Sequence, residues 1–206
     1  AATVVVTDIG IRSGEYISLI ITDNAKGGAQ AADYMATLVP KGSKVITFDF
    51  APTNDNGQTR QKGFEDRAKE LGLDVLPEQP LPALSLDAGR QAMEDLLVSE
   101  PDIKGVFSFN QLVIQGAYQA LEQQGKTDDV ALVGFDLDPV SYKMVADGKI
   151  DGLVVQDPYR MGFDGMNTVL TYLTGGKVEP FIGLGTTLLT KENVADFAAD
   201  PQVTGQ

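Results

Sequence analysis

Three short apolar runs, each followed by a helix-like segment, constrain the fold of this chain most. They cover residues 105–109, 130–135 and 152–155 and are rich in valine, leucine and phenylalanine. Runs of this length and composition are typical of strands buried on both faces, as in parallel sheets. Strands that alternate with helices predict an α/β fold with a doubly wound, Rossmann-like parallel sheet.

The rest of the chain follows the same alternation. Proline, glycine and capping residues mark where the helices begin and end. Further strands are expected at 3–7, 16–21, 44–50, 74–76, 181–184 and 186–189. Helices are expected at 23–39, from the polar loop 51–57 to Gly72, at 87–98, after the runs 105–109 and 130–135, and from Pro158 onward. The last residues are expected to form a weakly ordered tail.

Asn110, Asp136 and Gln156 each stand where one of the three buried runs ends. Because the carboxyl ends of parallel strands share one edge, where open α/β sheets bind ligands, we expect these side chains to lie together. Two amides and a carboxylate suit hydroxyl groups. The alternative interpretation is that Asn110 and Asp136 cap the following helices, a role that glutamine fills poorly and that is compatible with ligand contact.

Composition narrows the possible functions. The 206 residues allow one large domain or two small ones, and the net charge of -13 disfavours binding to nucleic acid or anionic lipid. No apolar stretch reaches membrane-spanning length. Without cysteine or histidine, Ser-His-Asp catalysis, thiol chemistry and most zinc sites are excluded. We therefore expect no catalytic residue, metal site or cofactor, and we interpret Asp136 and Asp138 as solvated loop acids rather than a catalytic pair.

Six stretches resemble, in order and spacing, the type 1 periplasmic sugar-binding proteins, which are ribose-binding-like solute receptors of ABC transporters. They are TDN at 22–24, RQKGF at 60–64, VFSFN at 106–110, VGFD at 133–136, VVQDPYRMGFDGM at 154–166 and LLTKENV at 188–194. The resemblance implies a two-lobed receptor that closes around one sugar or polyol. It also implies a membrane permease as partner and a periplasmic or other extracytoplasmic location.

The resemblance also assigns roles to individual residues. Asn110, Asp136 and Gln156 match second-lobe residues that hydrogen-bond sugar hydroxyls. Arg60 matches an arginine that would make a charge-assisted bond to a sugar oxygen. Asp8 matches a first-lobe carboxylate that binds hydroxyls.

Three positions depart from the ribose-receptor pattern. Ile9 and Gln58 replace arginines, and Leu84 stands near the place of an aromatic residue that stacks on the sugar. We still place Gln58 among the substrate-binding residues, but the sugar is left open. Loss of that aromatic platform leaves open a different sugar, a polyol, or a ligand shape that Phe50 could cover.

The resemblance implies that most of the N-terminal lobe is lacking, and no signal peptide is visible at Ala1. The expected division is 1–22 as a remnant of the first lobe, 23–157 as the second lobe, 158–183 as a return to the first lobe, and 184–206 as a final crossover strand and tail. The apolar stripe of Phe163, Met166, Leu170 and Leu173 would then lack its cover. Such stripes seek a partner, so we expect a homodimer, a separately supplied first lobe, or a deliberately shortened chain.

Three other functions share parts of this pattern. One is a ligand-sensing or scaffold module of the same fold. Another is the effector core of a lactose-repressor-type regulator, which would need a basic DNA-binding head. The last is a carboxylate-based enzyme, which would need two acids, such as Asp8 and Asp136, about 5–9 Å apart across the substrate.

Overall fold

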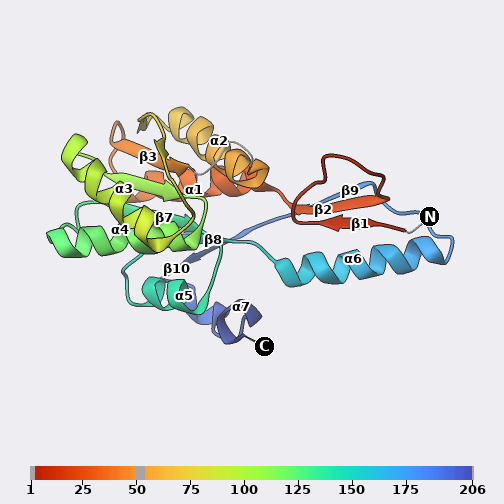
Figure 1. Ribbon diagram of the computed structural model, residues 1–206. Helices are drawn as coiled ribbons and strands as arrows, with labels where there is room; N and C mark the ends of the chain where they lie inside the picture. Colours follow the sequence, from red (N-terminus) through yellow and green to blue (C-terminus); the bar gives the residue numbers. More distant parts are fainter. Residues whose placement is uncertain (1–2, 50–53, 206) are drawn as a thin grey trace.

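The computed structural model describes residues 3–49 and 54–205. The described chain forms two bodies, each with its own sheet (Figure 1). The larger body, here the large lobe, contains a seven-stranded sheet in the order β10-β8-β7-β6-β3-β4, with β5 beside β3. All of these strands pair in parallel except β10, which is antiparallel to β8. Their bounds are β3 (Lys44–Asp49), β4 (Asp74–Val75), β5 (Gln79–Pro80), β6 (Gly105–Ser108), β7 (Ala131–Phe135), β8 (Gly152–Val155) and β10 (Thr187–Thr190).

Helices cover both faces of the large sheet, as the prediction of a doubly wound fold requires. Helix α1 packs against α2 on one face, and α3 packs against α4 on the other. Successive strand residues point to opposite faces, so Val106 joins the core under α3 and α4 while Phe107 joins the core under α1 and α2. The helices are α1 (Asn24–Leu38), α2 (Asp55–Glu70), α3 (Leu86–Ser99) and α4 (Gln111–Gln124).

The helices of each pair approach closely because glycines stand at the contact. A Cβ atom on Gly28 of α1 would lie 1.9 Å from the backbone oxygen of Arg60 in α2. A Cβ atom on Gly116 of α4 would lie 2.0 Å from the backbone oxygen of Leu86 in α3. The first contact fixes the position of the α2 turn that carries Arg60.

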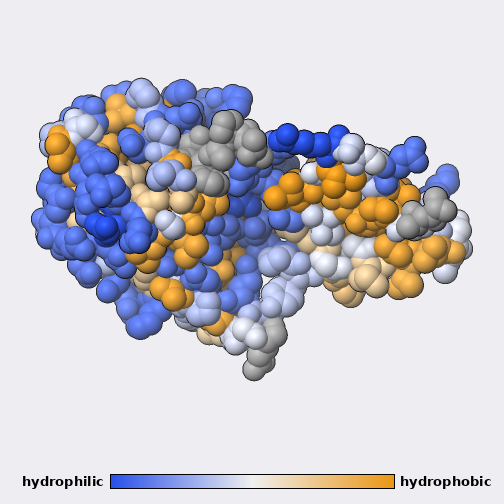
Figure 2. Space-filling model, in the orientation of Figure 1, coloured by the Kyte–Doolittle hydropathy of each residue, from blue (hydrophilic) through white to orange (hydrophobic). Residues whose placement is uncertain are grey.

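The smaller body, here the small lobe, is a three-stranded parallel sheet with one covering helix. Helix α6 contacts strands β1 and β2, and β9 pairs with β2. The bounds are β1 (Val5–Thr7), β2 (Ser18–Thr22), β9 (Phe181–Leu184) and α6 (Pro158–Leu173). The predicted uncovered stripe is confirmed, because Phe163, Met166, Leu170 and Leu173 are each more than half exposed. Figure 2 shows apolar residues gathered over this lobe.

The residues after β10 are packed, so the prediction of a weakly ordered tail is wrong. They form a 3₁₀ turn, η1 (Val194–Phe197), and a short helix, α7 (Pro201–Thr204), both in contact with α5 (Pro139–Ala146). Val194, Phe197 and Val203 pack against the large lobe's core. Elements of four residues are too short to show a hydrophobic period, which is why the sequence pattern did not reveal them.

The remaining predicted elements agree with the structure to within a few residues. The exceptions are β5, which lies in a predicted loop, and Phe50 with residues 51–53, which lie outside the described residues. No described helix is both long and apolar enough to cross a bilayer. The division of the chain at residues 22, 157 and 183 stays a prediction.

Candidate functional site

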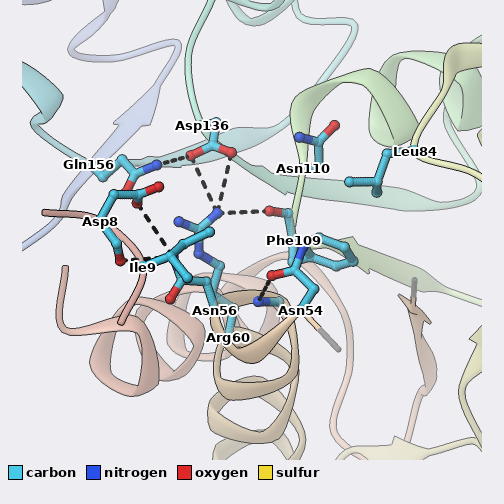
Figure 3. A pocket seen from close by; sticks show the side chains of 11 residues that line it. Asp8, Ile9, Asn54, Asn56, Arg60, Leu84, Phe109, Asn110, Asp136 and Gln156 are labelled. Carbon is cyan, nitrogen blue, oxygen red and sulfur yellow. Dashed lines mark hydrogen bonds and ion pairs between the residues drawn. The ribbon is translucent and has the colours of Figure 1, made fainter. Parts of the chain in front are cut away.

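A cavity of about 140 Å3 opens at the carboxyl ends of the large-lobe strands and is also lined by residues that follow β1 of the small lobe. Figure 3 shows the side chains around it. The cavity receives five of the six predicted site residues: Asp8, Arg60, Asn110, Asp136 and Gln156. Among the described residues, the others that line it are Ile9, Asn54, Asn56, Gly57, Leu84 and Phe109.

Strand ends place four of these side chains. Asp8, Asp136 and Gln156 directly follow β1, β7 and β8, and Asn110 follows β6 after one residue. Asp8 and Asp136 have φ angles of 68° and 71°, the left-handed region that non-glycine residues seldom occupy. They are the non-glycine residues with positive φ among those described, and such strain concentrates at functional sites.

Arg60 connects the large-lobe part of the site. It is only 4% exposed, and its Nε donates to Oδ1 of Asn24 at 2.8 Å. Its Nη1 donates to the backbone oxygen of Phe109 at 3.0 Å and lies 3.2 Å from Oδ2 of Asp136. The guanidinium also stacks on Phe135, with Cζ 3.7 Å from the ring centroid. These contacts hold the guanidinium in one orientation.

Burial perturbs both charges of this pair. It raises the pKa of Asp136, and the Arg60 charge and the Gln156 hydrogen bond offset this only in part. Burial also lowers the pKa of Arg60, against the opposing effect of Asp136. Charges kept from water and fixed in place are prepared to bind a polar ligand, since little reorganisation is needed.

Hydrogen bonds extend from this pair toward the small lobe. Nε2 of Gln156 donates to Oδ1 of Asp136 at 2.6 Å, and Oε1 of Gln156 accepts from Oγ1 of Thr22 at 2.7 Å. Nδ2 of Asn56 donates to the backbone oxygen of Asp8 at 3.2 Å, and Oδ1 of Asn56 accepts from Asn24 at 3.2 Å. The site is therefore linked to the ends of β1 and β2.

The capping interpretation is correct for one residue and wrong for the other. Oδ1 of Asn110 accepts from the backbone N–H of Leu112 and caps α4, while the residue also lines the cavity. Asp136 caps no helix. Its left-handed backbone turns the chain before α5, which Asp138 caps by accepting from the N–H of Ser141 at 2.6 Å. Asp138 therefore serves the helix. The expectation of a solvated loop acid is wrong for Asp136, whose side chain is only 20% exposed and pairs with Arg60.

Gln58 is the predicted site residue that is not among the described residues lining the cavity. On α2, Asn56 and Arg60 are four residues apart and share one side of the helix. Gln58 stands midway between them, about 200° around the helix from each. Helical rotation thus separates it from its neighbours, and its binding role stays a prediction.

Sequence reasoning missed Thr22, Asn24 and Asn56. Thr22 and Asn24 flank the end of β2, so the strand-end rule that selected Gln156 applies to them as well. Asn56 lies in the first turn of α2, directly after the polar loop, a position that often carries function. Among the described residues, no group of three or more acidic side chains could hold a metal ion.

Fold and cavity define an open α/β protein with two lobes and a polar site at its strand ends, the edge where such sheets bind ligands. The periplasmic binding protein domain family matches residues 1–177. The chain therefore belongs to that family, and the predicted family membership is confirmed.

Individual relatives agree. The chain is 33% identical over 189 residues to the ribose import binding protein of Escherichia coli strain K12, a match that covers 92% of this chain and 63% of that protein. A solved carbohydrate transporter solute binding protein from Agrobacterium radiobacter, in complex with D-arabinose, is 34% identical to this chain and has a TM-score of 0.83. The match covers 98% of this chain and 70% of the Agrobacterium chain. A periplasmic ribose ABC transporter structure from Conexibacter woesei DSM 14684 is 18% identical and has a TM-score of 0.89. The match covers 96% of this chain and 67% of the Conexibacter chain, and it shows that the two share a fold. The chain spans less than two thirds of the E. coli relative.

Proposed function

We propose that this chain binds a small sugar or polyol without converting it, as all or part of the solute receptor of an ABC transporter. One observation carries the proposal: Asp8, Arg60, Asn110, Asp136 and Gln156, which come from four strand ends and a helix, line one cavity. A hydroxyl group both donates and accepts, so a ligand with several hydroxyls matches a mixed set of donors and acceptors.

Each side chain has a part that its chemistry allows. The carboxylates of Asp8 and Asp136 accept from ligand hydroxyls, and the Arg60 guanidinium donates to a ligand oxygen. The amides of Asn110 and Gln156 do both. Ile9, Leu84 and Phe109 offer apolar surface to the C–H groups of the ligand.

The relatives support a neutral sugar. The E. coli relative is named for ribose import, and the Agrobacterium structure contains D-arabinose. Another relative, from E. coli, is a D-allose-binding periplasmic protein. By extension, we place the protein outside the cytoplasm, with a membrane permease as its partner and no chemical reaction of its own.

Closure of the two lobes completes the proposed site. A cavity of about 140 Å3 is small beside the several hundred Å3 typical of small-molecule pockets. The ligand would enter between the lobes, and rotation about the segments that join them would bury it.

The test is a titration of the ¹⁵N-labelled chain with D-ribose, D-arabinose, D-allose and xylitol at millimolar concentrations, followed by NMR. We expect one ligand to give saturable shifts centred on the cavity residues. Asp136→Asn should weaken binding about tenfold or more, because a carboxylate acceptor is lost. The matched control is Asp128→Asn at an exposed loop position, which should bind normally. Absence of saturable shifts with every ligand would contradict the proposal.

A further inference from the structure

Gln156 is held through its backbone as well as through its side chain. Its side chain binds Asp136 and Thr22. Its backbone oxygen accepts a hydrogen bond from Nε2 of Gln202, at 3.1 Å. The two glutamines are 46 residues apart, so this contact depends on the folding of the C-terminal segment.

Gln202 belongs to a segment that is fixed to the large lobe. Asp200 caps α7 by accepting from the backbone N–H of Gln202 at 2.8 Å. Val203 and Phe197 pack against the core of the large lobe, and α7 contacts α5. Since its backbone and neighbours are held, the Gln202 side chain reaches Gln156 from a fixed base.

The contact lies where the chain passes from one lobe to the other. Residues 156 and 157 join β8 of the large lobe to α6 of the small lobe. A hollow of about 380 Å3 at this place is lined by Gln156, Gln202 and Gly185, the last of which lies in the crossing from β9 to β10. Figure 1 shows α7 on the side of the large lobe from which α6 departs.

We infer that Gln202 is a positioning residue for the candidate ligand site, acting through Gln156. By tying the Gln156 carbonyl to the large lobe, Gln202 keeps the Gln156 amide directed at Asp136 while the small lobe rotates. Rotation then occurs beyond this carbonyl, from Asp157 onward. The role in ligand binding rests on the proposed function, whereas the role in holding Gln156 does not.

The test compares Gln202→Met, which keeps the side-chain length and removes the donor, with Gln202→Glu, whose carboxylate repels the Gln156 carbonyl. Gln123→Met, at an exposed position of α4, is the matched control. The first readout needs no ligand: the NMR signals of the Gln156 side-chain amide, which report its bond to Asp136. We expect both Gln202 variants to shift these signals toward those of an exposed amide and the control to leave them unchanged.

The second readout is affinity for whichever of D-ribose, D-arabinose, D-allose and xylitol the wild-type chain binds. We expect Gln202→Met to weaken binding about two- to tenfold, the usual effect of one hydrogen bond. Wild-type Gln156 signals in both folded Gln202 variants would overturn the inference, even if sugar binds. If the wild-type chain binds none of the four, the receptor proposal fails, and the amide signals still decide whether Gln202 positions Gln156.

Discussion

Asp136 has three roles in this site. It pairs with the charge of Arg60, accepts a hydrogen bond from Gln156 and lines the cavity. Burial raises its pKa, so it takes up a proton at a higher pH than an ordinary aspartate. Only the carboxylate form accepts from ligand hydroxyls with both oxygens. Ligand affinity should therefore be highest at pH values above this pKa, and it should fall as the pH is lowered through it.

The measurement is ligand affinity at a series of pH values from about 7 to about 4, above and around the range in which ordinary aspartates titrate. We expect the wild-type chain to lose affinity before the midpoint of an exposed aspartate is reached. Asp136→Asn should bind more weakly, with a flatter dependence on pH. Affinity that stays constant over this range would show that the Asp136 carboxylate does not contact the ligand.

The strand-end rule predicted most of the cavity lining from sequence. It placed Asn110, Asp136 and Gln156 together without knowledge of the packing, because sheet topology alone brings the ends of β6, β7 and β8 to one edge. Asn24 and Asn56 contact each other across the α1–α2 interface. How two helices pack is decided by side-chain contacts that a single sequence does not display, and so this pair was missed.

At the level of elements, the glycine contact between α1 and α2 determines where Arg60 lies. Gly28→Ala would place a methyl group 1.9 Å from the Arg60 backbone oxygen and force the helices apart. Overpacking of this kind costs about 1–3 kcal/mol. We expect denaturant unfolding to show this loss, together with shifted NMR signals for the Arg60 side chain.

Two matched variants separate stability from site geometry. Gly116→Ala creates the same conflict between α3 and α4, so it should destabilise the chain while leaving the Arg60 signals near their wild-type positions. Gly162→Ala in α6 meets no atom within 4 Å and should stabilise the helix by about 0.5–1 kcal/mol. Equal stability of all three variants would refute the close-packing explanation.

The start of β8 offers a second prediction for an element. Oδ2 of Asp151 accepts from the backbone N–H of Leu132 at 2.7 Å, and burial raises the pKa of Asp151. A raised pKa in the folded state means that protonation favours folding. The buried charge therefore lowers the free energy of unfolding fully at neutral pH and not at all at low pH, where the carboxyl is protonated in both states. Asp151→Asn keeps an acceptor and removes the charge.

Asp151→Asn should therefore be more resistant to urea than the wild-type chain at neutral pH. The difference should vanish below about pH 4, the range in which an unfolded aspartate is itself protonated. Urea unfolding at both pH values measures this, with Asp128→Asn as the exposed control. An advantage that persists unchanged at low pH would mean that charge burial is not its cause.

Elements with a clear hydrophobic period were predictable, and short ones were not. The sheet followed from runs such as 130–135, whose composition marks strands buried on both faces. Strand β5 and helix α7 have two and four residues, and tertiary contacts rather than local pattern hold them in place. For that reason the last residues were wrongly predicted to be weakly ordered.

For the whole molecule, the small lobe presents an unusual surface. Parallel sheets are normally covered on both faces, yet here α6 covers β1 and β2 from one side. Phe181 at the edge strand and the outward residues of α6 remain more than half exposed. Contiguous apolar surface of this kind marks a place of association.

We therefore expect the 206-residue chain to associate through the small lobe. Light scattering should give a mass above 22.0 kDa that rises with protein concentration. Replacing both Phe163 and Leu170 by glutamate should return the mass to 22.0 kDa, because burying paired negative charges at a self-interface is costly. The matched control is Val98→Glu on α3 of the large lobe, where the wild-type valine is 83% exposed, and it should leave the mass of the assembly unchanged. A wild-type chain that stays at 22.0 kDa at every concentration would show that this surface does not bind a second copy.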